Sequence, residues 1–385
     1  MTIVKAANAA EFLALLPRML GFRPARSLVL VPFAGTRSLG AMRFDLPDSG
    51  SDGHDSAAAT IVGLACRVSD VDAIAIAVYT DAAFAGSTAP PHRDLVDALE
   101  RRADACGLRV TDALVVATDG WCSYFDDEAP AGGRRLTELA DADDGAAAEQ
   151  PDPDQDAGAA LPVVDAADAA LVETALADLD RAVEAMCGRL DDERGASRPP
   201  KRTTARSDRI DPRGLAAVLA LDDLPATFES ALAVGHAELD AYETALLIWC
   251  LERPAVRDIA LAQWALGAGA GDRALEAQLR WEEGEAYPAH LARFMWGEGD
   301  QPDAARLDVA LRLTRRLAAA APSAHRPGAL GAAAWLAWAL GRSTHAAIHA
   351  RTALEIDPDH GLSGIVTAFV EAGHLPDWAF RRRGE

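Results

Sequence analysis

Four side chains that follow two apolar runs are of types that could hold a polar ligand. Tyr79 and Asp81 come after the first run, and Asp119 and Trp121 come after the second. The carboxylates could bind a metal ion or hydroxyl groups, and the indole could stack on a ring. The alternative is that both aspartates only begin loops and cap helices, as aspartate often does.

Arg43 and Asp45 are a second candidate pair. They alternate with Met42, Phe44 and Leu46, so in a strand the two charged side chains share one face. Opposite charges two residues apart could hold a polar ligand. The alternative is an exposed ion pair worth roughly 0–1 kcal/mol.

Motifs with established chemistry are incomplete in this sequence. Gly35 to Gly40 has the spacing of a phosphate loop but lacks the lysine that binds phosphate, and no G-x-S-x-G motif is present. His345 and His349 could share a metal on one helix, but no H-E-x-x-H glutamate accompanies them. We interpret them as solvent-facing and expect no metal site. No catalytic residue or cofactor is indicated, and enzymatic activity stays open.

The candidate side chains must be positioned by a sheet in the first 140 residues. Leu28 to Val31 is an unbroken apolar run, typical of a strand buried on both faces, and Pro32, which cannot donate to a ladder, marks a strand end or an edge. A short glycine-containing loop joins it to an alternating strand, 41–46, which predicts an antiparallel hairpin. Further buried strands are predicted at 73–78 and 114–117.

Helices are predicted between these strands. Asn8 and Glu11 have the spacing of a capping box, and Gly21 is a natural helix end. Strand–helix–strand spacing predicts right-handed crossovers and parallel pairing. The expected fold is an α/β domain with a mostly parallel sheet plus a hairpin and helices on the faces. Ligands gather at the carboxyl ends of parallel strands, where Tyr79, Asp81, Asp119 and Trp121 fall.

Composition divides the chain into four parts. Residues 1–140 form the α/β domain. Residues 141–160 are rich in Asp, Ala, Gly and Pro, which predicts an acidic disordered linker. Residues 161–212 read as an acidic helix followed by a basic linker, and residues 213–385 as an all-helical domain punctuated by prolines.

Charge and cysteine usage limit the class of partner. The net charge is −22, and residues 141–196 alone carry 16 acidic and 3 basic side chains. This balance makes nucleic-acid binding unlikely, although the basic segment 198–209 could touch a phosphate backbone. Five widely spaced cysteines without a C-x-x-C pair indicate reduced thiols. With no membrane-spanning run and no signal-peptide pattern, we expect a cytoplasmic protein that does not enter membranes.

The C-terminal part contains one helix pair similar to a tetratricopeptide repeat. Its turn glycine, small contact residues and terminal proline fall at Gly341, Ala346, Ala350, Ala353 and Pro358. One such repeat does not establish a solenoid, which needs several.

Both ends of the chain resemble a known bacterial family. The segments Gly21-Phe22-Arg23-Pro24, Ser27-Leu28-Val29 and 43–47 (RFDLP), with 353–362 and 373–378, resemble domain-of-unknown-function family 4192. The acidic stretch 141–160 departs from the family as an insertion, and Ala25 replaces a polar residue. The family has no assigned activity. The resemblance implies a cytosolic bacterial protein and draws attention to Arg43, Asp45 and Trp121.

Two classes of function fit these observations. The favoured one is a non-catalytic interaction or regulatory protein, whose helical part binds a protein partner. The alternative is a small-molecule or nucleotide-binding enzyme, with its site at the carboxyl edge of the N-terminal sheet. The sequence does not give the ligand, the partner or the oligomeric state.

Overall fold

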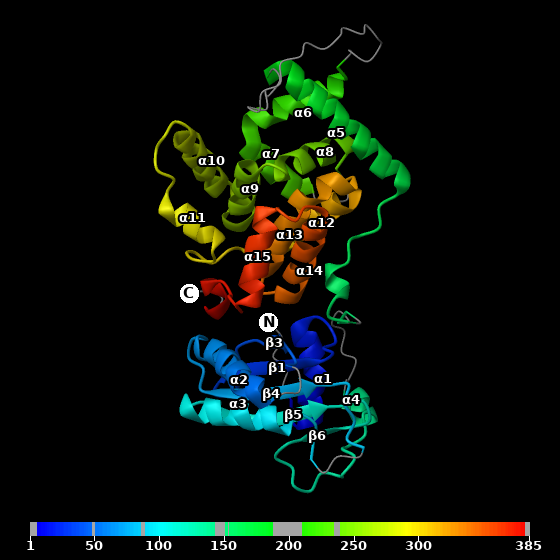
Figure 1. The fold of residues 1–385 in the computed structure, drawn as a ribbon, viewed down its shortest axis with the longest axis vertical. Coiled ribbons are helices and arrows are strands. Elements are labelled where there is room, and N and C mark those ends of the chain that lie inside the picture. Colours follow the sequence, from blue (N-terminus) through cyan, green and yellow to red (C-terminus); the bar gives the residue numbers. More distant parts are fainter. Residues whose placement is uncertain are drawn as a thin grey trace. The chain divides into compact units, whose positions relative to one another are not determined.

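The computed structural model describes residues 6–47, 51–85, 89–142, 151–152, 154–187, 210–234 and 239–381 (Figure 1). The chain divides into two compact units. Unit 1 comprises residues 1–158 and 380–385, and unit 2 comprises 159–379. The basic segment 198–209 and residues 143–150 and 153 of the predicted acidic linker lie outside the described residues.

Unit 1 contains a six-stranded mixed sheet between two helical layers. The strands are β1 (Ser27–Ala34), β2 (Arg37–Ser38), β3 (Met42–Asp45), β4 (Ala73–Tyr79), β5 (Arg109–Val116) and β6 (Trp121–Ser123). The helices are α1 (Ala9–Leu20), α2 (Ser51–Cys66), α3 (Arg93–Ala105) and α4 (Thr137–Ala142). Helices α2 and α3 pack on one face, and α1 and α4 on the other.

Local sequence signals explain the first elements. Asn8 caps α1 by accepting a hydrogen bond from the backbone N–H of Glu11 at 2.9 Å, and Gly21 ends the helix with φ 83°, as predicted. In β1, Leu28 and Leu30 pack under α2 and α3 while Val29 and Val31 pack under α1. The unbroken apolar run is therefore buried on both faces, as predicted.

The prediction of a mostly parallel sheet is wrong. Only β4 and β5 pair in parallel among the described strands, and β1 pairs antiparallel with β2, β3 and β4. The predicted antiparallel hairpin is present: β1 and β3 pair with each other and extend the sheet beyond β4, with β1 next to β4. Strands β3 and β4 run in the same direction on either side of β1, so the connection between them through α2 crosses over β1.

Two further differences lie in turns and strand ends. Pro32 does not end β1 but pairs with Ile74 inside it. The Pro32 carbonyl accepts from the N–H of Leu39. The nitrogen and carbonyl of a strand residue point to the same side, so the Pro32 nitrogen faces β2 and β3. The pairing register of β1 changes between these two strands, and no N–H donor is needed there. The segment 117–120 is a tight turn that returns the chain as β6, antiparallel to β5.

Unit 2 is helical throughout its described residues. Its helices are α5 (Ala166–Cys187), α6 (Pro212–Leu219), α7 (Leu224–Val234), α8 (Ala241–Leu251), α9 (Pro254–Leu266), α10 (Ala268–Glu282), α11 (Ala289–Met295), α12 (Ala304–Ala320), α13 (Arg326–Ala339), α14 (Ser343–Ile356) and α15 (Gly361–Glu371). Every residue of α13 from Pro327 to Ala339 is buried, and α12, α14 and α15 pack around it. In the described part of the chain, no helix has the length and apolar character needed to cross a bilayer.

Close packing of α9 against α10 gives the first testable prediction. A Cβ at Gly271 would lie 2.1 Å from Oε1 of Gln263, whose side chain is fully buried and donates to the Pro225 carbonyl at 2.7 Å. We expect Gly271→Ala to lower the free energy of unfolding by about 1–3 kcal/mol, because the added methyl group displaces this amide. Urea unfolding followed by tryptophan fluorescence measures the loss.

Gly269 in the same helix provides the matched control. A Cβ there meets only the flexible end of Arg273, at 3.6 Å. Gly269→Ala should leave stability unchanged or raise it slightly, since alanine favours helix. Equal losses in the two variants would contradict the packing explanation.

Candidate functional site

The six predicted ligand-binding residues lie at one edge of the sheet in unit 1. Strands β3, β4 and β5 end at this edge, and β1 and β6 begin there. Asp45 and Tyr79 are both partners of Ser27 in the strand register, and Trp121 follows in the same row across Val116. Directly opposed residues share a face, so this row lies on the α1 side of the sheet.

Arg43 and Asp45 form an asymmetric pair. Their ion pair measures 2.6 Å, but the Arg43 side chain is only 9% exposed and that of Asp45 is 87% exposed. Arg43 Nε also donates to Ser27 Oγ at 2.8 Å. The Arg43 guanidinium therefore lies below the surface, and the solvent-exposed carboxylate of Asp45 pairs with one of its nitrogens.

Ser27 connects this pair to a distant part of the chain. Its Oγ lies 2.7 Å from the Ala25 carbonyl oxygen and 3.2 Å from Gln155 Oε1, and its single proton serves one of them. Near it, the backbone N–H of Asp152 donates to the Gly21 carbonyl at 2.8 Å. Residues near the end of the predicted linker therefore contact the start of β1.

Tyr79 carries a buried hydroxyl that has no hydrogen-bond partner among the described residues. Burial raises the pKa of its phenol, so the group stays protonated at neutral pH. A buried polar atom without a partner costs about 1–3 kcal/mol. This hydroxyl is the atom at the sheet edge that a small ligand could satisfy.

Asp119 and Asp81 serve local contacts. Asp119 accepts from the backbone N–H groups of Phe84 at 2.9 Å and Ala85 at 3.1 Å, and the first of these bonds lowers the pKa of its carboxyl. Asp81 lies 3.7 Å from Arg26, and both side chains are 75% exposed, which makes this a weak ion pair. In the described ranges, no three His, Cys, Asp or Glu side chains are grouped to hold a metal ion.

Trp121 is covered and does not present a free ring. It is 4% exposed, and its indole N–H donates to the Arg135 carbonyl at 3.2 Å. The guanidinium of Arg134 lies 5.9 Å from the ring centroid. A ligand could stack on this indole only after the segment around Arg134 and Arg135 had moved.

Sequence reasoning missed Ser27 and Gln155 as members of this edge. Ser27 directly precedes the apolar run, where a polar residue marks a strand start without indicating a site. Gln155 lies 128 residues further along the chain, and no local pattern links it to Ser27.

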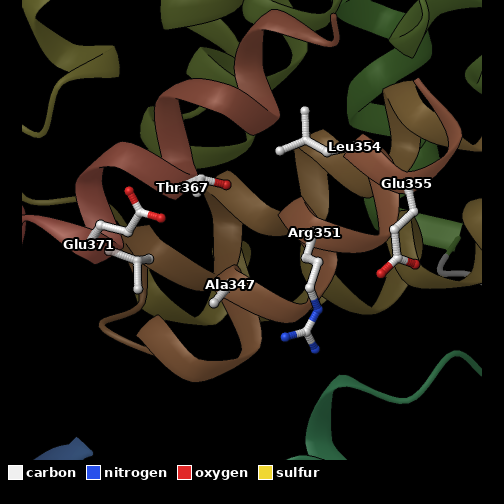
Figure 2. Close-up of a pocket in the computed structure, with 7 residues that line it drawn as sticks. Ala347, Arg351, Leu354, Glu355, Thr367 and Glu371 are labelled. Atoms are coloured by element: carbon white, nitrogen blue, oxygen red, sulfur yellow. The ribbon is translucent and has the colours of Figure 1, made fainter. Parts of the chain in front are cut away.

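A second candidate site is a groove between α14 and α15 in unit 2 (Figure 2). It has a volume of about 460 Å³. Figure 2 shows α14 contributing one wall and α15 the other. The lining residues are Ala347, Arg351, Leu354, Glu355, Thr367, Val370 and Glu371. Their spacing of three and four residues places them on the facing stripes of the two helices.

His345 and His349 are buried, so the prediction that they face solvent is wrong. They are 8% and 2% exposed. Burial, followed by the charges of Arg315 and His345, lowers the pKa of His349 to about 3. Histidine occurs on both buried and exposed helix faces, and the sequence did not distinguish the two here. A neutral imidazole at position 349 is a packing residue of unit 2.

Together, the fold and its two candidate sites define a two-unit protein, with a mixed α/β sheet unit followed by a helical one. The chain belongs to the family described as "Domain of unknown function (DUF4192)", whose model matches residues 10–377. This confirms the resemblance found in the sequence. Neither the curated proteins nor the solved structures gave a match.

The burial of His349 predicts a pH dependence of stability. Its folded pKa of about 3 lies below the ordinary value of 6.5, so below pH 6.5 the unfolded chain takes up a proton that the folded chain excludes. Between pH 6.5 and about 3, this group should lower the free energy of unfolding by about 1.4 kcal/mol for each unit by which the pH falls. Replacement by leucine removes the effect, so between pH 7 and pH 5 His349→Leu should lose roughly 2 kcal/mol less than the unsubstituted chain.

Tryptophan fluorescence in urea follows this transition, because seven of the eight tryptophans lie after residue 212. The exposed His290 supplies the control, and His290→Leu should keep the pH dependence of the unsubstituted chain. An identical pH dependence in His349→Leu and the unsubstituted chain would show that this imidazole is not kept neutral.

Proposed function

We propose that the chain is a cytoplasmic, non-catalytic interaction protein, and that the groove between α14 and α15 binds a peptide segment of a protein partner. The observation that carries this proposal is a groove whose apolar floor is flanked by charged side chains that have no ion-pair partner among the described residues. The free thiols support the cytoplasm, and the absence of a complete catalytic motif in the sequence supports a binding role.

The groove has the composition of a peptide site. Ala347, Leu354 and Val370 supply apolar surface from two helices. Val370 packs against the core of unit 2, whereas Leu354 does not belong to that core. Leu354 can therefore contact a partner without disturbing the folded unit. An apolar side chain of a bound peptide would bury against it, as anchors do in helix-lined grooves.

The rim indicates the charge of the partner segment. Glu355 and Glu371 flank the groove together with Arg351, and none of the three forms an ion pair with another described residue. Two carboxylates against one guanidinium favour a basic peptide. We therefore commit to a partner segment in which an apolar residue lies next to lysine or arginine.

Tight packing beneath the groove supports a preformed site. Ala346, Ala350 and Ala353 are fully buried on α14, and Gly341 turns the chain between α13 and α14 with φ 76°. These are the small-residue positions of a tetratricopeptide-like pair, and we propose that the pair presents α14 to partners in that manner. A rigid wall lowers the ordering cost of binding.

Selection from a displayed peptide library on the full chain tests this function. We expect enriched sequences that combine an apolar residue with lysine or arginine. Leu354→Lys should raise the dissociation constant of the selected peptide at least tenfold, because it places a charge on the apolar floor and repels a basic peptide. Fluorescence anisotropy with the labelled peptide measures the change.

Ile365→Lys is the matched control. Ile365 is an exposed residue of α15, 40% accessible, that does not line the groove. This variant should keep the affinity of the unsubstituted chain. Equal binding by Leu354→Lys and Ile365→Lys, or the enrichment of acidic peptides only, would exclude this groove as the proposed site.

A second candidate function is the binding of a small polar molecule or nucleotide at the carboxyl edge of the sheet in unit 1. The hydroxyl of Tyr79, which has no partner among the described residues, favours it, and Ser27, opposite Tyr79 in the strand register, accepts from the buried guanidinium of Arg43. An anionic or hydroxyl-bearing ligand would accept from both groups.

A thermal-shift screen of nucleotides, sugar phosphates and divalent metals tests the second candidate. A ligand bound at this edge should raise the melting temperature, and Tyr79→Phe should abolish the shift. Without ligand, Tyr79→Phe should be as stable as the unsubstituted chain or more stable, because it removes an unsatisfied polar atom. A shift that persists in Tyr79→Phe, or the absence of any shift, would rule out this site.

A further inference from the structure

Two cysteines that are 40 residues apart in the sequence meet at one edge of the sheet in unit 1. Cys66 is the last residue of α2, and Cys106 is the C-terminal cap of α3. Each helix leads into one strand of the parallel pair, α2 into β4 and α3 into β5. The two strands begin side by side, with Ala73 opposite Arg109, so the helices that precede them end at the same edge.

Packing between the helices brings the two thiols together. Helices α2 and α3 cover the same face of the sheet through residues such as Ile61, Val62 and Leu99 (Figure 1). The thiols of Cys66 and Cys106 lie near enough to interact, and both residues are exposed. By contrast, Cys122 and Cys250 are buried.

We propose that Cys66 and Cys106 form a site of reversible oxidation, at which a disulfide links the ends of α2 and α3. The oxidant is a low-molecular-weight disulfide such as oxidised glutathione. One thiolate attacks it, which forms a mixed disulfide and releases one reduced glutathione. The second thiolate then displaces the other glutathione, so the protein loses two hydrogens and two electrons and the oxidant gains them.

The position of the pair gives the bond a structural consequence. The turn that follows Cys66 contacts Phe380 of the same unit, where the guanidinium of Arg67 lies 4.0 Å from the ring centroid and the N–H of Ser69 donates to the Phe380 carbonyl at 3.4 Å. A bond between Cys66 and Cys106 would fix both helix ends beside this contact. The oxidised unit should therefore unfold at a higher temperature than the reduced one.

Burial, followed by the hydrogen bond and charge of Cys106, raises the pKa of the Cys66 thiol. The thiolate is the reactive form, so exchange at this pair is slow compared with an activated cysteine. The appropriate measurement is therefore an equilibrium titration rather than a rate.

The experiment equilibrates the full chain with glutathione buffers from fully reducing to fully oxidising, traps free thiols by alkylation and maps the products by mass spectrometry. We expect a peptide pair linked through Cys66 and Cys106, lighter by two hydrogens than the reduced pair and restored by dithiothreitol. The oxidised sample should melt at a higher temperature. Separate glutathione adducts on both cysteines, or two thiols that remain alkylated in every buffer, would overturn the proposal.

Single substitutions distinguish a specific pair from general oxidation. Cys66→Ser and Cys106→Ser should each stop the internal bond, and the remaining cysteine should accumulate as a glutathione adduct. Cys187→Ser should leave the bond intact. A Cys66 or Cys106 bond to Cys122, Cys187 or Cys250 in place of the proposed partner would also overturn it. These results are independent of peptide binding to α14 and α15.

Discussion

The arrangement of unit 1 depends on the position of β1 between β3 and β4. Its apolar run is buried on both faces, and its backbone pairs with a neighbour on each side. An interior strand satisfies its polar backbone in both directions, whereas an edge strand leaves one row of donors and acceptors to water. Burial of Leu28 to Val31 is therefore compatible with an interior position, and this position makes the sheet mixed.

The same constraint determines which residues meet at the two ends of the strands. Because β1 runs opposite to β3 and β4, its first residue Ser27 lies beside the last residues of both, Asp45 and Tyr79. This creates the polar row and buries Arg43 against Ser27. At the other end of the strands, the helices before β4 and β5 end together, which places Cys66 near Cys106. Residues far apart in the sequence thus become neighbours through topology alone.

Local patterns in the sequence predicted the elements but not their order. Asn8, Glu11 and Gly21 specify the ends of α1 through backbone hydrogen bonds and a left-handed turn, which act within a few residues. Alternation and apolar runs predict strands, yet they carry no information about which strand is the neighbour. The contact of Gln155 with Ser27 and the burial of His349 depend on packing between distant segments, and no local signal marks either.

The two candidate sites differ in what binding would have to break. At the sheet edge, Asp119 already accepts two backbone hydrogen bonds and Trp121 lies under Arg134, so a ligand there must replace existing contacts. In the groove of unit 2, Arg351 and Glu371 are in no ion pair with another described residue, and no such contact has to be given up. The binding free energy is what remains after the cost of giving up existing contacts, so this comparison favours the groove as the binding site. At the sheet edge, the Tyr79 hydroxyl is the exception, since satisfying it would remove a cost that the folded chain already bears.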